Sequence, residues 1–92
     1  MVAVKRMVLD VLKPHLPSAI DFSRAIAEVG DGYRVCLTVL EMDENTQTLS
    51  LEIEANSIDF AAIESAITAM GGSLHSIDQV EVRNISGMDS MS

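Results

Sequence analysis

Two histidines, one cysteine and a few carboxylates on apolar segments are the side chains of this sequence that could take part in chemistry. The segment VLDVLKPH carries Asp10 within an apolar run and ends at His15. The segment GGSLHSID carries His75 and Asp78. Imidazoles and carboxylates serve as metal ligands and as acids or bases, so these two segments hold the candidate functional residues.

Hydrophobic periodicity predicts the elements that position these residues. Alternation of apolar and polar side chains predicts strands over residues 4–13, 33–42, 47–55 and 74–85. The last strand changes parity between Ile77 and Val80, which indicates a bulge near Asp78 and Gln79 or a strand that is apolar on both sides. Apolar residues at helical spacing predict one helix that Ser18 and Asp21 cap and a second that Gly71 and Gly72 end. Nine residues satisfy both periods and form the expected core: Leu9, Val11, Ile26, Leu37, Val39, Leu51, Ile53, Ile63 and Ile67.

The order strand, helix, strand, strand, helix, strand predicts a fold of the α+β class. Right-handed crossovers and one apolar face per helix favour the split β-α-β arrangement, a four-stranded antiparallel sheet in the order 4-1-3-2 with both helices on one face. We expect one domain over residues 1–86 and a disordered tail over residues 87–92, where the sequence has no period.

The charge balance bears on the partners of the chain. Six lysines and arginines stand against fourteen aspartates and glutamates, a net charge of -8, which repels nucleic acid and anionic lipid unless the basic residues cluster. The start of the sequence has no signal-peptide pattern, and no apolar run approaches the roughly 20 residues that span a bilayer. A single cysteine fits a reducing compartment, so we expect a cytoplasmic protein that binds neither nucleic acid nor membrane.

Asp10 has three interpretations, because a carboxylate on a central strand is costly unless it is paired, solvated or bound to a cation. It is a surface carboxylate, a hydrogen-bonding or ion-pairing group at a subunit interface, or a ligand of a hard metal together with Glu52 or Asp78. Oxygen ligands favour calcium or magnesium over zinc.

His15 and His75 are expected at one edge of the sheet, since the end of the first strand lies beside the start of the last. They are turn or edge residues with satisfied hydrogen bonds, or ligands of zinc or nickel. Cys36 lies on a strand with no basic neighbour in sequence, which is typical of a small apolar filler and not of a nucleophile.

Self-association is predicted from the strand faces turned away from the helices. Val8, Leu12, Cys36 and Leu40 lie on these faces, where two helices on the other side cannot cover them. A large apolar patch on so small a domain marks a contact surface, so these four residues are the interface candidates. Two different surfaces in contact close a ring, and two identical ones a dimer.

Four segments carry a resemblance to a known family: RMVLDVLKPHLPS, YRVCLTVLEMDENTQTLSLEIE, IDFAAIESAI and MGGSLHSIDQV. Together they make residues 4–84 similar to the archaeal family catalogued as domain of unknown function 211. The resemblance implies a ferredoxin-like fold, a cytoplasmic setting and ring-like self-association, and it implies no reaction.

Two classes of function follow. The first is a self-assembling cytoplasmic module of unknown biochemical role that holds a metal ion or small ligand at or near its subunit contacts. The second is a small enzyme with a site at a subunit junction, built from Asp10, His15 and His75. The small size of the subunit leaves little room for a buried site, which favours the module over the enzyme.

Overall fold

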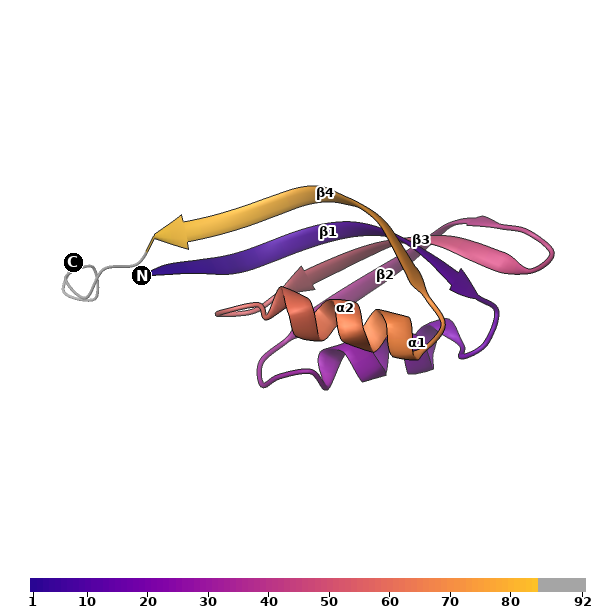
Figure 1. The fold of residues 1–92 in the computed structure, drawn as a ribbon, viewed down its shortest axis with the longest axis horizontal. Helices are drawn as coiled ribbons and strands as arrows, with labels where there is room; N and C mark the ends of the chain where they lie inside the picture. The colour runs from indigo at the N-terminus through magenta and orange to yellow at the C-terminus, as the bar shows by residue number, and fades with distance from the viewer. Residues whose placement is uncertain (85–92) are drawn as a thin grey trace.

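The fold is a four-stranded antiparallel sheet with two helices on one face, seen in a computed structural model that describes residues 1–84 (Figure 1). The elements in chain order are β1 (Val2–Pro14), α1 (Ala19–Ala27), β2 (Arg34–Met42), β3 (Thr46–Glu54), α2 (Phe60–Ala69) and β4 (Ser73–Asn84). The sheet order is β2-β3-β1-β4, which confirms the predicted ferredoxin-like α+β fold. The expected tail, residues 87–92, lies outside the described residues.

Local signals in the sequence set the ends of both helices. The Ser18 hydroxyl accepts a hydrogen bond from the Asp21 amide at 3.2 Å, as the predicted cap requires. Asp59 caps α2 in the same way, through the Ala62 amide at 3.1 Å. Gly71 follows α2 with a φ of 82°, a left-handed conformation that glycine adopts without strain. Neither helix of the described residues is long and apolar enough to cross a membrane.

The core lies between the helices and the inner face of the sheet. Seven of the nine expected core residues are fully or almost fully buried, among them Leu9, Leu51 and Ile63. Two expectations were wrong: Leu37 is half-buried and Val39 is 39% exposed. Both lie on β2, the edge strand, where α1 covers only part of the inner face.

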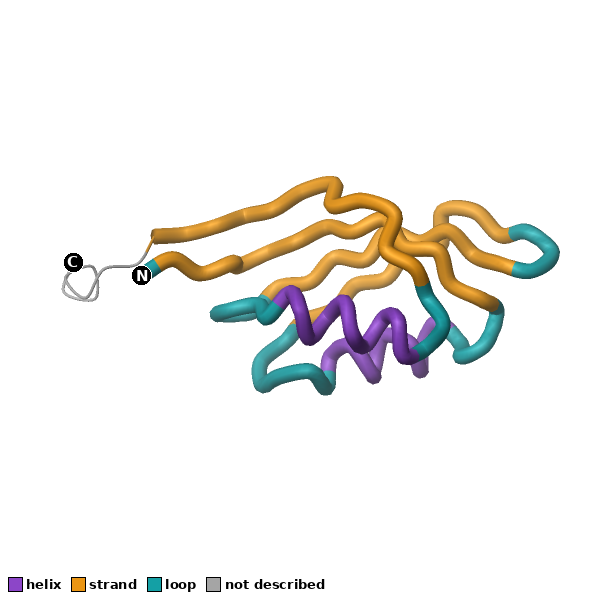
Figure 2. The backbone as a smooth tube through the Cα atoms, in the orientation of Figure 1, coloured by secondary structure: helices purple, strands orange, loops and turns teal. Residues whose placement is uncertain are grey.

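The sheet is longer than the layer of helices. Figure 2 shows β1 and β4 running on together beyond the helices toward the N-terminus, while the β2–β3 turn lies at the other end. Residues 2–5 of β1 precede the first pair with β3, Arg6 with Glu54. Here β1 pairs with β4, through Val2 with Asn84 and Ala3 with Arg83.

Three bulges interrupt the pairing of β1 with β4. They leave Lys5 unpaired on β1 and Asp78 and His75 unpaired on β4. The bulge at Asp78 is the predicted one, where the parity of the apolar residues changes along β4. Bulges re-aim the side chains around them, so the outer face of the sheet does not follow simple alternation.

Candidate functional site

Asp10 lies in the middle of the outer face, the sheet face opposite the helices. Its neighbours in register are Ser50 on β3 and Ser76 on β4, and Thr38 on β2 follows beyond Ser50. The row therefore consists of one carboxylate and three hydroxyl-bearing side chains. Within residues 1–84, no ion pair or side-chain hydrogen bond of Asp10 is formed, and the residue is half-buried.

The other two predicted metal ligands have partners of their own. Glu52 Oε2 accepts from Arg6 Nε at 3.1 Å and lies 3.6 Å from a terminal nitrogen of Arg34. Asp78 lies in the bulge of β4, where its carboxylate accepts a hydrogen bond from Ser76 Oγ at 2.7 Å. In the part of the chain that the structure describes, no three histidine, cysteine or acidic side chains gather closely enough to hold a metal ion.

The two histidines are near the predicted edge but face different neighbours. The end of β1 does lie beside the start of β4, where Leu12 pairs with Ser73. His15, however, donates from Nε2 to the carbonyl oxygen of Asp43 at 2.9 Å, on the turn between β2 and β3. His75 is an exposed bulge residue on β4. His15 therefore serves to hold the β1–α1 loop against that turn.

The predicted interface residues do not form a continuous apolar patch. Val8 lies opposite Gln79 on one side and Glu52 on the other, and Glu52 separates it from the exposed Cys36. Leu40 is 61% exposed and is the unpaired residue of a bulge in β2, so it falls out of the predicted row. Polar and apolar side chains thus alternate along the outer face, which the parity of each strand alone did not reveal.

Lys13 is a buried ionisable residue that we did not identify from the sequence. It is completely buried on the inner face of β1. Its ammonium donates to Pro14 O at 2.8 Å, to His15 O at 3.3 Å and to Gln47 Oε1 at 3.2 Å. It also lies 5.8 Å from the centre of the Phe22 ring. Its burial could have been predicted from the alternation of the strand, because Lys13 follows Leu9 and Val11 at the positions that point inward. Burial lowers the pKa of Lys13 by desolvating its charged form.

A charged row crosses all four strands at the end of the outer face. Glu81 on β4 lies beside Arg6 on β1, which lies beside Glu54 on β3, which lies beside Arg34 on β2. Opposite charges on neighbouring strands stabilise a sheet, although each exposed pair contributes little. This row forms one wall of a cavity.

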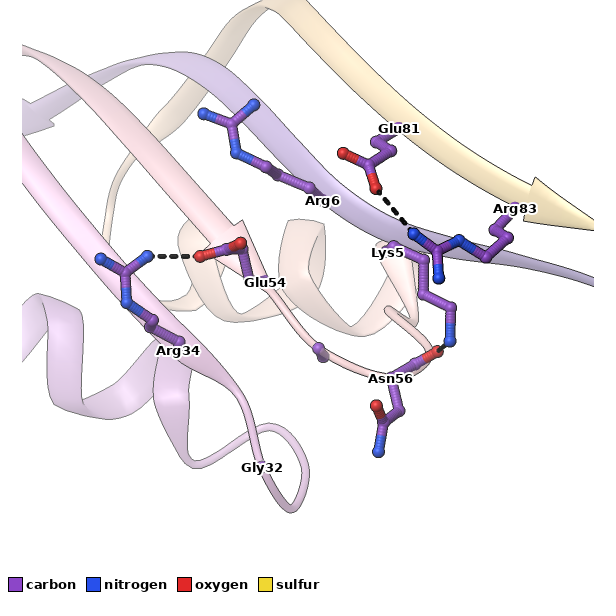
Figure 3. A pocket seen from close by; sticks show the side chains of 9 residues that line it. Lys5, Arg6, Gly32, Arg34, Glu54, Asn56, Glu81 and Arg83 are labelled. Carbon is purple, nitrogen blue, oxygen red and sulfur yellow. Dashed lines mark hydrogen bonds and ion pairs between the residues drawn. The ribbon is translucent and has the colours of Figure 1, made fainter. Parts of the chain in front are cut away.

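The cavity has a volume of about 450 Å³ and is open to solvent (Figure 3). We call it the cationic pocket, because four of the six basic side chains of the chain line it: Lys5, Arg6, Arg34 and Arg83. Two carboxylates, Glu54 and Glu81, and the small residues Gly32, Ala55 and Asn56 complete the lining. Sequence reasoning missed this pocket because its cations come from three strands that are far apart in the chain.

Two other surfaces with exposed apolar side chains lie at opposite sides of the subunit. On the edge strand β4, Ile77, Val80 and Val82 are 46%, 47% and 52% exposed. On the other side, Ile20 of α1 is 66% exposed and lines, with Leu37 of β2, a groove of about 340 Å³. We call the first surface the β4 row and the second the α1–β2 groove.

Comparison with known proteins finds a family without a described reaction. The model of the DUF211 family, described as "Uncharacterized ArCR", matches residues 5–86. A relative from the archaeon Methanocaldococcus jannaschii, itself an uncharacterised protein, is 39% identical over 77 residues, which cover 84% of this chain and 79% of the relative.

Proposed function

This chain belongs to the DUF211 family, and we propose that it is a self-assembling module whose copies join through the β4 row and the α1–β2 groove. The observation that carries the proposal is the β4 row, because three large apolar side chains about half exposed on an edge strand are costly in water. Burying such side chains is worth about 1 kcal/mol or more each, in proportion to the area removed from water. Assembly supplies the missing cover.

The backbone of β4 supports the same proposal. A 12-residue strand at the edge of a sheet presents a long series of unpaired amide and carbonyl groups. Proteins normally cover such an edge, shorten it or charge it. In β4 the bulges at His75 and Asp78 break its regularity, but the part after Asp78 is regular up to Glu81. That part carries Val80 of the β4 row.

The α1–β2 groove is the matching surface on the opposite side of the subunit. Ile20 and Leu37 give it an apolar floor, and Arg24 lies at its rim with 75% of its side chain exposed. The β4 row is flanked by Asp78 and Glu81, which carry the opposite charge. This complementarity favours a second copy of the chain as the occupant, and it would set the orientation of the contact more than its strength.

Two different surfaces in contact give a head-to-tail arrangement, which closes into a ring when the rotation between neighbours allows it. The family resemblance implies the same outcome. The alternative, an enzyme that uses Asp10, His15 and His75, has less support, because His15 lies beyond the end of β1, where it is hydrogen-bonded to the backbone of Asp43, and Asp10 lies in the middle of the strand.

Native mass spectrometry and light scattering test the proposal. The wild type should have a mass of two or more chains, each of 9.9 kDa. Val80→Glu damages only the β4 row and Ile20→Glu only the α1–β2 groove, so each variant alone should be a monomer. Ser65→Glu adds the same charge on an exposed position of α2, away from both surfaces, and should assemble normally.

A mixture of the two variants distinguishes the head-to-tail contact from a symmetric one. Ile20→Glu keeps an intact β4 row and Val80→Glu an intact groove, so one good contact remains and the mixture should form a species of two chains. A wild type of one chain mass would refute self-assembly. Assembly of Ile20→Glu alone would show that the contact is symmetric and does not use the groove.

A further inference from the structure

We propose that the cationic pocket binds a small anion of the phosphate or pyrophosphate class. Four cationic and two anionic side chains line it, and a third carboxylate, Glu52, pairs with Arg6 and Arg34, which leaves a local surplus of one positive charge in a chain whose net charge is -8. Lys13 is buried and Arg24 lies elsewhere, so four of the five accessible basic side chains line one cavity. Charge of one sign in a concave site raises the local concentration of the opposite ion.

The bulge at Lys5 concentrates this charge. In a regular strand Lys5 and Arg6 would point to opposite faces, because successive side chains alternate. The pairing of β1 with β4 shifts between Val4 and Arg6, and both Lys5 and Arg6 line the pocket. Bulges of this kind often lie beside functional sites, where they re-aim a side chain.

Lys5 and Arg83 are the groups with the most capacity to bind a ligand. The Lys5 ammonium donates to the backbone oxygen of Asn56 at 2.6 Å, which fixes it with one of its three hydrogens (Figure 3). The guanidinium of Arg83 lies 3.9 Å from Glu81 Oε2, too far for a strong hydrogen bond, and its side chain is 67% exposed. Both can turn donors toward an anion without leaving a buried partner unsatisfied.

Arg6 and Arg34 form the wall in which the guanidinium groups are paired with carboxylates. Glu52 binds both, at 3.1 Å and 3.6 Å, and Arg34 also pairs with Glu54. The shared carboxylate orients the two guanidinium groups at the outer face. A planar guanidinium held in place loses little freedom when it binds a phosphate oxygen, which favours recognition of this geometry.

The lining also indicates the size and chemistry of the ligand. Nine residues in the described part of the chain line the pocket, and none of them is aromatic. The methyl group of Ala55 is the one apolar side chain among them, apart from the hydrogen of Gly32. There is accordingly no aromatic surface on which a base would stack, which favours recognition of the charged group itself. The negative charge of the rest of the protein disfavours a long nucleic acid.

The site is built within one chain, so the inference does not depend on self-assembly. Calorimetric titration of the full chain with pyrophosphate should show saturable binding, with weaker binding of inorganic phosphate. Lys5→Gln and Arg83→Gln should each raise the dissociation constant about tenfold or more. Arg24→Gln, which removes the same charge from an exposed position outside the pocket, should change it less than twofold.

Three results would overturn the inference: no saturable binding by the wild type, an equal loss in Arg24→Gln, or citrate or a single-stranded oligonucleotide binding more tightly than pyrophosphate. Ile20→Glu, which disrupts the proposed assembly contact but not the pocket, should bind pyrophosphate with unchanged affinity. Loss of binding in that variant would overturn the assignment of the site to one chain, whatever the outcome for self-assembly.

Discussion

The ammonium of Lys13 lies 3.2 Å from Gln47 Oε1, and both side chains are buried between the sheet and the helices. The two residues are direct partners in the register of β1 with β3, so their contact follows from the pairing of the strands. The backbone carbonyls of Pro14, the last residue of β1, and of His15 accept the remaining hydrogen bonds of the ammonium. A fully bonded cation is tolerated inside a protein, although its desolvation still costs free energy.

The desolvation of Lys13 predicts a specific pH dependence. Its pKa in the folded state is lowered from 10.5, so in the interval between the lowered value and 10.5 the unfolded chain binds more protons than the folded one. The free energy of unfolding therefore rises with pH across this interval. Lys13→Met keeps the volume and lacks this titration, so the wild type should gain stability relative to Lys13→Met as pH rises toward 10.5. Urea unfolding of both proteins measures this, and parallel pH profiles would contradict it.

Asp43 makes the stability of the protein depend on pH in the acidic range. Its carboxylate accepts hydrogen bonds from the Thr46 and Asn45 amides and the Thr46 hydroxyl, and these bonds hold its pKa below the usual 3.8. The stabilisation is present above pH 3.8 and is lost as pH falls through the lowered pKa. Asp43→Ala should thus be less stable than the wild type at neutral pH, and the difference should shrink in acid.

The control for Asp43 is Glu44→Ala, which removes one carboxylate from the same turn. Because Asp43 organises the turn that His15 contacts through its backbone, we expect the Asp43 variant also to loosen the β1–α1 loop. Hydrogen exchange of the Asn45 and Thr46 amides measures the turn directly. Equal exchange in Asp43→Ala and the wild type would contradict the role assigned to the carboxylate.

The elements of the fold were predictable because their signals are local. The alternation in β3 and the caps at Ser18 and Gly71 depend on residues a few positions apart, and the structure confirms them. The bulge at Asp78 was also visible as a change of parity. Val39 was misassigned because alternation shows which face a residue lies on, but not whether a helix covers that part of the face.

The sites were less predictable because they depend on the arrangement of strands. Lys13 was overlooked although its parity points inward, since a lysine is rarely fully buried. The cationic pocket needs the sheet order, which brings Arg34 and Arg83 from the two edge strands to one end of the outer face, and a bulge at Lys5. The order was predicted from the pattern of elements, but the bulge at Lys5, which depends on how β1 pairs with β4, was not.

Leu51 and Leu40 provide a matched test of the packing. Leu51 is completely buried, and Leu51→Ala should reduce the free energy of unfolding by about 2 to 5 kcal/mol because a cavity replaces its side chain. Leu40 is 61% exposed at a bulge, and Leu40→Ala should cost about 0.5 kcal/mol or less. Chemical denaturation of the two variants measures the difference. Similar losses would show that Leu40 is covered in the assembled protein.

Calcium or magnesium binding at Asp10 stays a prediction. The melting temperature measured at increasing cation concentration tests it. A hard cation on the outer face would take the Asp10 carboxylate together with the neighbouring Ser50 and Ser76 oxygens, or would have to compete with Arg6 for Glu52. A cation bound only to the folded state raises the melting temperature in proportion to the logarithm of its concentration. Asp10→Asn should abolish that rise.

The control for the cation test is Asp21→Asn, which removes a carboxylate from α1, outside the sheet. It should retain the full response to calcium, since it changes the net charge as Asp10→Asn does and leaves the outer face intact. Glu52→Gln separates the two modes of binding. If Glu52 is a ligand, this variant loses the response; if the serine oxygens complete the site, it keeps it. An unchanged melting temperature of the wild type at millimolar calcium and magnesium would remove the metal site and leave Asp10 as a structural carboxylate of the sheet.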